Sequence, residues 1–212
     1  EMDLDKEFQI IKEFVKSGEG VFKKPQKNAT FEYGDDKHLL SLKNTLIRSR
    51  GSKISITEPE TVTDDVLWEY IKLQKNLSNK QVKEFAKYHK IAMSIETKLG
   101  NLLESFIYKY IKKHNWIWCS GSIIQDIDFI NKGIDERGEI QWISLQVKNS
   151  DNSENSSSSR VRVGTNIKKW FRRLSKVKNK DNWIELSKIV KKDDQELITE
   201  LSEKNYLDYL KT

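Results

Sequence analysis

The sequence is poor in cysteine, the residue on which disulfide-rich proteins and many zinc-binding proteins depend. Its 212 residues contain one cysteine, Cys119. A single cysteine cannot form a disulfide within the chain or supply a cysteine-rich zinc site. Proteins without disulfides are typical of reducing compartments. We therefore expect a cytoplasmic protein.

Long hydrophobic runs and nucleotide-binding motifs are missing as well. No apolar run approaches the roughly 20 residues that span a bilayer, and the first residues, EMDLDKEF, have no signal-peptide character. We expect no association with membranes. The chain also carries no phosphate-loop glycine motif and no dinucleotide fingerprint.

Basic and aromatic residues are abundant by contrast. The net charge is +6, and 21 Trp, Tyr and Phe residues (6, 7 and 8) argue against a disordered chain. A basic balance favours a polyanionic partner such as nucleic acid. The positive charge is concentrated between residues 160 and 180, a segment that contains no acidic residue.

The first half of the chain has helical patterns. Residues 64–75 and 79–90 suit helices, the second of them beginning with a capping box. The strongest pattern covers residues 96–115, where apolar residues recur three and four positions apart. Residues 1–93 are therefore predicted to form a mostly helical N-terminal region.

The period changes to that of β-strands after residue 115. Residues 116–130 and 140–149 are rich in β-branched and aromatic residues, and "RVRVG" at 160–164 suits a third strand. From about Lys168 the pattern is helical again. We expect an α/β fold with a mixed central sheet in residues 94–212, either as a separate domain or continuous with the N-terminal region.

Polar residues on the two clearest strands are candidates for catalysis. Residues two apart on a strand share a face, so Gln146 and Lys148 point one way and Val147 the other. Asp126 and Asp128 share a face by the same argument, and a hairpin would bring one of them to the Gln and Lys pair. Carboxylate and amide oxygens suit Mg²⁺, and a lysine can orient a water beside it. Asp128 is preferred over Asp126, and both stay open.

Glu104 is a further candidate because it flanks the apolar face of the predicted helix 96–115. A helix packed on the sheet would hold it near the strand edge. Each candidate also has an ordinary explanation. Gln146 and Lys148 would suit the exposed face of any strand, Asp126 and Asp128 would suit a solvated strand end, and Glu104 would suit a solvated helix flank.

Three short motifs taken together resemble the PD-(D/E)XK nucleases: "GNLLE" at 100–104, "DIDF" at 126–129 and "QVK" at 146–148. The resemblance implies a restriction endonuclease-like core that hydrolyses phosphodiesters with a metal-activated water. It implies Mg²⁺ as cofactor, with Mn²⁺ able to substitute. The residues implied as catalytic are Asp128, Gln146, Lys148 and Glu104, and those implied as metal ligands are Asp128, Gln146, Asp126 and Glu104. Gln146 departs from the family, which usually has Glu there.

A narrower resemblance, over residues 95–183, is to the SinI-like type II restriction endonucleases. It implies a homodimer that cuts double-stranded DNA at a short palindrome, and a methyltransferase that protects the same site without binding the enzyme stably. The segment 149–173 would contact DNA, its last basic residues lying along a helix. The expected DNA-binding residues are Asn149, Ser150, Asn152, Asn155, Ser157, Arg160, Arg162, Thr165, Lys168, Lys169, Arg172 and Arg173.

Two other functions fit the same residues. One is a structure-specific nuclease or resolvase on the same core, which would cut by DNA shape. The other is a non-catalytic DNA-binding protein in which Gln146 marks lost activity. Such a protein would bind DNA with a steep salt dependence and stay inert with metal.

Overall fold

The computed structural model describes residues 3–51, 64–151, 166–176 and 182–211. The chain divides into two compact units, residues 1–52 with 102–212, and residues 53–101. The predicted domain boundary between residues 93 and 94 stays a prediction. No helix among the described residues is both long enough and apolar enough to cross a membrane.

A four-stranded mixed sheet forms the centre of the first unit. The strands are β1 (Trp116–Trp118), β2 (Phe129–Ile134), β3 (Ile140–Ser150) and β4 (Ile167–Arg173). They lie in the order β1-β2-β3-β4; the first three pair antiparallel, and β4 runs parallel to β3. The predicted pairing of residues 116–130 with residues 140–149 is confirmed in the antiparallel pair β2 and β3, and so is the mixed α/β sheet.

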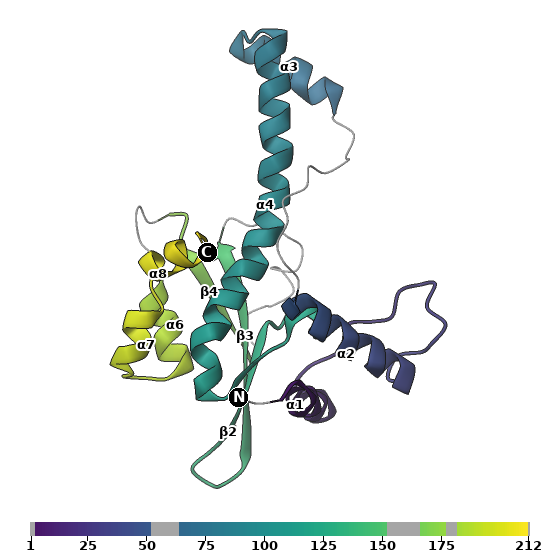
Figure 1. Ribbon diagram of the computed structural model, residues 1–212, viewed down its shortest axis with the longest axis vertical. Helices are drawn as coiled ribbons and strands as arrows, with labels where there is room; N and C mark the ends of the chain where they lie inside the picture. Colours follow the sequence, from purple (N-terminus) through teal and green to yellow (C-terminus); the bar gives the residue numbers. More distant parts are fainter. Residues whose placement is uncertain (1–2, 52–63, 152–165, 177–181, 212) are drawn as a thin grey trace. The chain divides into compact units, whose positions relative to one another are not determined.

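Helices cover both faces of this sheet (Figure 1). On one face, α1 (Leu4–Lys16) and α2 (Asp36–Gly51) share a buried core with alternate strand residues such as Ile117 and Ile130. On the other, the end of α4 (Asn79–Ile111) and the C-terminal helices pack against Trp116, Trp118 and Val147. Those helices are α6 (Trp183–Val190), α7 (Gln195–Glu200) and α8 (Glu203–Tyr209).

The helix α4 is longer than the sequence pattern predicted. Two helices were expected, at 79–90 and 96–115, whereas one helix runs from Asn79 to Ile111. The residues between the two predicted segments include no proline or glycine, so nothing interrupts the backbone ladder. Its predicted capping box is confirmed: the Ser78 amide donates to Gln81 Oε1 at 2.9 Å, and the Gln81 amide donates to Ser78 Oγ at 3.3 Å.

Two strand expectations need correction. Residues 167–173 form β4 and not a helix, because pairing beside β3 buries Trp170 in the core. The single strand expected at 116–130 is two strands: β1 ends at Trp118, and β2 begins only at Phe129 and continues to Ile134. Asp126 has a φ of 59°, a left-handed conformation incompatible with an extended strand. The third strand predicted at 160–164 lies outside the described residues.

In the second unit, α3 (Asp65–Lys75) matches the helix predicted at 64–75. The Asp64 side chain caps its start by accepting from the amides of Val66 and Leu67, at 3.1 and 3.2 Å. Asn76, with a φ of 51°, ends it in a left-handed conformation. The cap at each end explains why so short a helix has sharp limits.

Candidate active site

The strand β3 presents Gln146 and Lys148 on one face of the sheet. Val147, between them, is buried in the core on the opposite face, as the alternation predicted. The parallel strand β4 lies alongside, with Lys169 in register with Gln146 and Phe171 in register with Lys148. Because paired residues of neighbouring strands project to the same side, Lys169 lies beside Gln146. Sequence reasoning had placed Lys169 on a helix.

Asp128 is held against the same stretch of β3 by its backbone and side chain. Its amide donates to the Leu145 carbonyl at 3.0 Å, and its carboxylate Oδ2 accepts from the Val147 amide at 2.7 Å. The second contact holds the carboxylate against the β3 backbone at Val147, the residue between Gln146 and Lys148. Asp128 therefore lies at the predicted position through a bend before β2, and not through a shared strand face with Asp126.

Glu104 reaches the site from the part of α4 that packs on the sheet. Its Oε2 accepts a hydrogen bond from Trp118 Nε1 at 2.8 Å, and Trp118 is a buried residue of β1. Burial raises the pKa of Glu104, and the nearby Asp128 raises it further, while Trp118 and Lys148 lower it. The structure therefore brings Glu104, Asp128 and Lys148 into one electrostatic group.

Asp128 has a perturbed pKa for related reasons. Burial raises it above the ordinary range, the Val147 amide and Lys148 act against that rise, and Asp126 adds to it. Two buried carboxylates that oppose each other's ionisation, next to a lysine, form an arrangement more common at functional sites than elsewhere. A bound cation would relieve the repulsion between them.

Gln146 supplies a third oxygen that fits such a cation. The residue is 1% exposed, and its Oε1 has no hydrogen-bond partner among the described residues. A buried acceptor without a partner costs about 1–3 kcal/mol, which a hard cation would offset. Within the described part of the chain, no group of three His, Cys, Asp or Glu residues could hold a metal by itself. Two carboxylates and one amide oxygen nevertheless form a donor set that suits a divalent metal.

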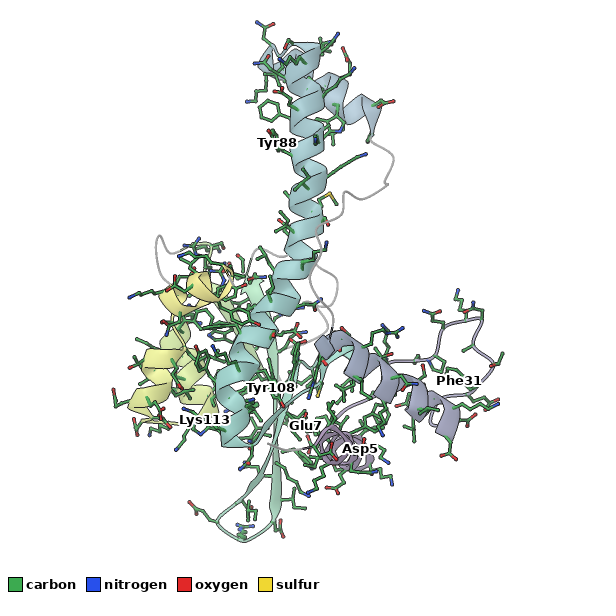
Figure 2. The ribbon with its side chains drawn as sticks, viewed as in Figure 1. Asp5, Glu7, Phe31, Tyr88, Tyr108 and Lys113 are labelled. Atoms are coloured by element: carbon green, nitrogen blue, oxygen red, sulfur yellow. The ribbon has the colours of Figure 1, made fainter. Side chains whose placement is uncertain are left out.

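A buried polar network joins the N-terminal helices to this site. Arg50 of α2 pairs with Glu7 of α1 at 2.6 Å and donates to the Trp118 carbonyl. The Tyr108 hydroxyl donates to Glu7 Oε1 at 2.7 Å; both residues are labelled in Figure 2. The strand that holds Trp118 beside Glu104 is therefore tied to α1 and α2. No local sequence pattern links Trp118 to Glu104, 14 positions away.

The predicted DNA-binding residues other than Lys169 divide into three groups. Lys168 and Arg173 are exposed on β4, and Asn149 and Ser150 end β3. Arg172 is only partly exposed: it pairs with Glu203, lies 5.4 Å over the Tyr206 ring and donates to Asn149 Oδ1 at 3.3 Å. The residues outside the described ranges are Asn152, Asn155, Ser157, Arg160, Arg162 and Thr165.

Lys169 differs from the other basic residues of β4. Burial lowers its pKa, and the positive charge of Lys148 lowers it further, whereas Asp126 raises it. Lys148 and Asp126 therefore both influence the charge of Lys169. We group Lys169 with the candidate active site and not with the exposed cations Lys168 and Arg173.

Comparison with known proteins finds relatives of one kind, the type II restriction enzymes. The sequence matches the family described as SinI restriction endonuclease over residues 1–212, well beyond the segment in which the resemblance was first visible. It is 34% identical over 182 residues to the type II restriction enzyme Eco47I of Escherichia coli, covering 85% of this chain and 77% of the relative. It is 32% identical over 182 residues, with the same two coverages, to the type II restriction enzyme SinI of Salmonella infantis.

Proposed function

The chain belongs to the SinI restriction endonuclease family and is a type II restriction endonuclease that cleaves DNA at a specific site; we propose that it does so by Mg²⁺-dependent hydrolysis around Asp128, Gln146 and Lys148. The observation that carries this proposal is the contact between Asp128 Oδ2 and the Val147 amide. It places a carboxylate beside the Gln-Val-Lys strand, the relationship expected of a PD-(D/E)XK core.

Membership of the family implies a divalent metal, and Asp128, Gln146 and Glu104 would hold it, with Asp126 close to Asp128. When bound there, Mg²⁺ would supply a Lewis acid that polarises a phosphate and acidifies water, and Mn²⁺ is expected to substitute. Support comes from the buried Gln146 oxygen that lacks a partner among the described residues and from the raised pKa values of both carboxylates.

Lys148 would orient the attacking water and stabilise negative charge on the phosphate as the reaction proceeds. Asp128 would keep its position through the Val147 amide, and Glu104 through the Trp118 indole. Gln146 carries no charge where the wider superfamily usually has an acid. Metal affinity would consequently depend more heavily on Asp128 and Glu104 than in enzymes with three acids.

The target would be a short palindrome cut by a homodimer, because a two-fold protein matches a two-fold site. The exposed cations Lys168 and Arg173 of β4, together with Asn149 and Ser150, would contact DNA. The residues from Asn152 to Thr165 that were predicted to read the sequence keep that proposed role. A separate methyltransferase would protect the host at the same sequence.

Digestion of phage-sized linear DNA with Mg²⁺, followed by sequencing of the fragment ends, tests the proposal. The wild type should give discrete fragments with one common end sequence. Lys148→Ala should slow cleavage by about 10²–10³-fold, the typical loss when one charge-stabilising group is removed. Lys132→Ala is a matched control, since Lys132 lies in β2 and pairs with Glu13 at the surface at 2.7 Å.

Other results would point to the rival functions. A smear of fragments that Lys148→Ala abolishes would indicate a nuclease that recognises DNA shape. DNA binding without cleavage, in either Mg²⁺ or Mn²⁺, would indicate that Gln146 has abolished catalysis. Equal rates for Lys148→Ala and Lys132→Ala would remove Lys148 from the mechanism.

A further inference from the structure

The helix α3 has an apolar stripe that nothing in the described structure covers. Val66, Tyr70 and Leu73 are 79%, 61% and 69% exposed. Their spacing of four and three residues places them on one helix face. Exposed apolar side chains scattered singly are ordinary, but a continuous stripe on one helix indicates an interaction surface.

The stripe is not the face by which α3 packs within its own unit. The Trp68 ring lies 5.8 Å from the ring of His89 in α4, and Trp68 and Ile71 are both partly buried. Helical spacing places these two residues on the side opposite Val66, Tyr70 and Leu73. The helix is therefore apolar on two faces, of which α4 covers only one. A helix with this pattern requires a second partner.

The charges along α3 indicate what that partner is. Acidic residues occupy its beginning and basic residues its end. The acids are Asp64, Asp65 and Glu69, and the bases are Lys72 and Lys75. If two copies of α3 pack antiparallel about a two-fold axis, the acidic half of each faces the basic half of the other. The surface is thus complementary to itself, which is the requirement for a two-fold contact.

The apolar residues obey the same two-fold arrangement. With the axis near Tyr70, Val66 of one copy lies opposite Leu73 of the other, and the two tyrosines meet at the centre. Glu69 borders the stripe and pairs with Lys72 within the helix at 3.1 Å. In the antiparallel pair, Glu69 of one copy can pair with Lys72 of the other instead. We propose that α3 is the homodimer contact of this enzyme, formed by Val66, Tyr70 and Leu73 of two copies.

This inference rests on the homodimer in the proposed function and adds the surface that forms it. One helix from each copy buries less than the roughly 800 Å² per partner of a standard interface. The contact is therefore weak in free protein. It is strengthened when two copies occupy the two halves of one DNA site, since each bound half raises the effective concentration of the other.

A disulfide test addresses the geometry directly. Cys119 is the sole cysteine and is buried. A covalent dimer would therefore be formed through the introduced cysteine. The variant Tyr70→Cys places two thiols near the axis and should form a covalent dimer on mild oxidation, seen on a non-reducing gel. Tyr88→Cys is the matched control, because Tyr88 is 65% exposed on α4 and projects into solvent (Figure 2).

Sedimentation velocity tests the energetics. Tyr70→Glu should raise the dimer dissociation constant by about 100-fold or more, since each dimer loses two central side chains. Glu69→Lys and Lys72→Glu should each weaken the dimer, and the double variant should restore it. Circular dichroism of each variant checks that the helix content is unchanged.

The proposal is overturned if Tyr70→Cys and Tyr88→Cys crosslink equally, or if Tyr70→Glu dimerises as the wild type does. The proposal is also overturned if the wild type stays monomeric at tens of micromolar and Tyr70→Cys forms no covalent dimer. These measurements need neither DNA nor metal, so their failure leaves the nuclease proposal standing. Conversely, Lys148→Ala should keep the dimer even where it loses cleavage.

Discussion

The two units of this chain differ in how their helices are stabilised. In the unit with the sheet, two buried cores on opposite faces fix α1, α2, the end of α4 and the C-terminal helices. In residues 64–101, by contrast, none of the side chains whose burial the structure describes is buried. Catalysis requires groups held in place by packing, whereas a surface that meets a partner leaves its apolar side chains exposed until the partner binds. The contrast indicates a rigid unit around the proposed active site, and a second unit, α3 with the first part of α4, whose full stability depends on contacts outside itself.

The sharpest test of this contrast compares one aromatic side chain from each unit. Phe106 is fully buried and contacts four other aromatic rings. Phe106→Ala should lower the free energy of unfolding by about 3–5 kcal/mol. Tyr88→Ala, which removes an exposed ring from α4, should change it by less than about 0.5 kcal/mol. Urea denaturation measures both. Similar losses of unfolding free energy in the two variants would show that the second unit has a core of its own.

A smaller effect concerns the cost of keeping carboxylates buried in the catalytic unit. The pKa of Glu104 is raised to about 8 by burial and by Asp128. Between the ordinary value of 4.5 and this value, the folded protein binds more protons than the unfolded chain, so metal-free stability should fall as pH rises through that range. Glu104→Gln removes the dependence and should be the more stable protein at pH 9, by roughly a few kcal/mol.

Thermal unfolding in chelator at pH 5, 7 and 9 measures this difference. Adding Mg²⁺ should reverse the order of the two proteins at high pH, because only the wild type retains the carboxylate for the ion. Parallel stability profiles for the wild type and Glu104→Gln would contradict the interpretation. Glu96→Gln, on an exposed position of the same helix, is the control and should follow the wild type.

The smallest effect isolates one hydrogen bond. Trp118→Phe removes the indole N–H that donates to Glu104 but keeps an aromatic ring in the core. Loss of a residue that orients a metal ligand typically costs about 10–100-fold in activity or metal affinity. We expect cleavage to fall about 10-fold at low Mg²⁺ and to recover partly as Mg²⁺ is raised, with DNA affinity unchanged.

Trp116→Phe provides the comparison for that experiment. Trp116 lies in the same strand and core, but its indole donates to the Val190 carbonyl at 3.4 Å, away from the carboxylates. It should lose stability without a change in Mg²⁺ dependence. Equal Mg²⁺ dependence in both tryptophan variants would mean that the Trp118 contact does not position Glu104.

The sequence by itself determined the features that depend on local periodicity. Alternation in 140–149 placed Val147 in the core and Gln146 and Lys148 on the other face, and the Ser78 and Gln81 pair marked the start of α4. The three short motifs indicated the nuclease family. Each of these depends on residues within a few positions of one another, where backbone geometry alone decides which side chains share a face.

Only the tertiary structure decided what happens between distant segments. The run IKKWFRR suits a helix or a strand, and pairing with β3 made it a strand, which brought Lys169 beside Gln146. The same is true of Trp118 and Glu104, and of the Glu7 and Arg50 pair that ties α1 and α2 to β1. These contacts join residues from separate elements, so they depend on strand register and helix packing, which local sequence patterns do not specify.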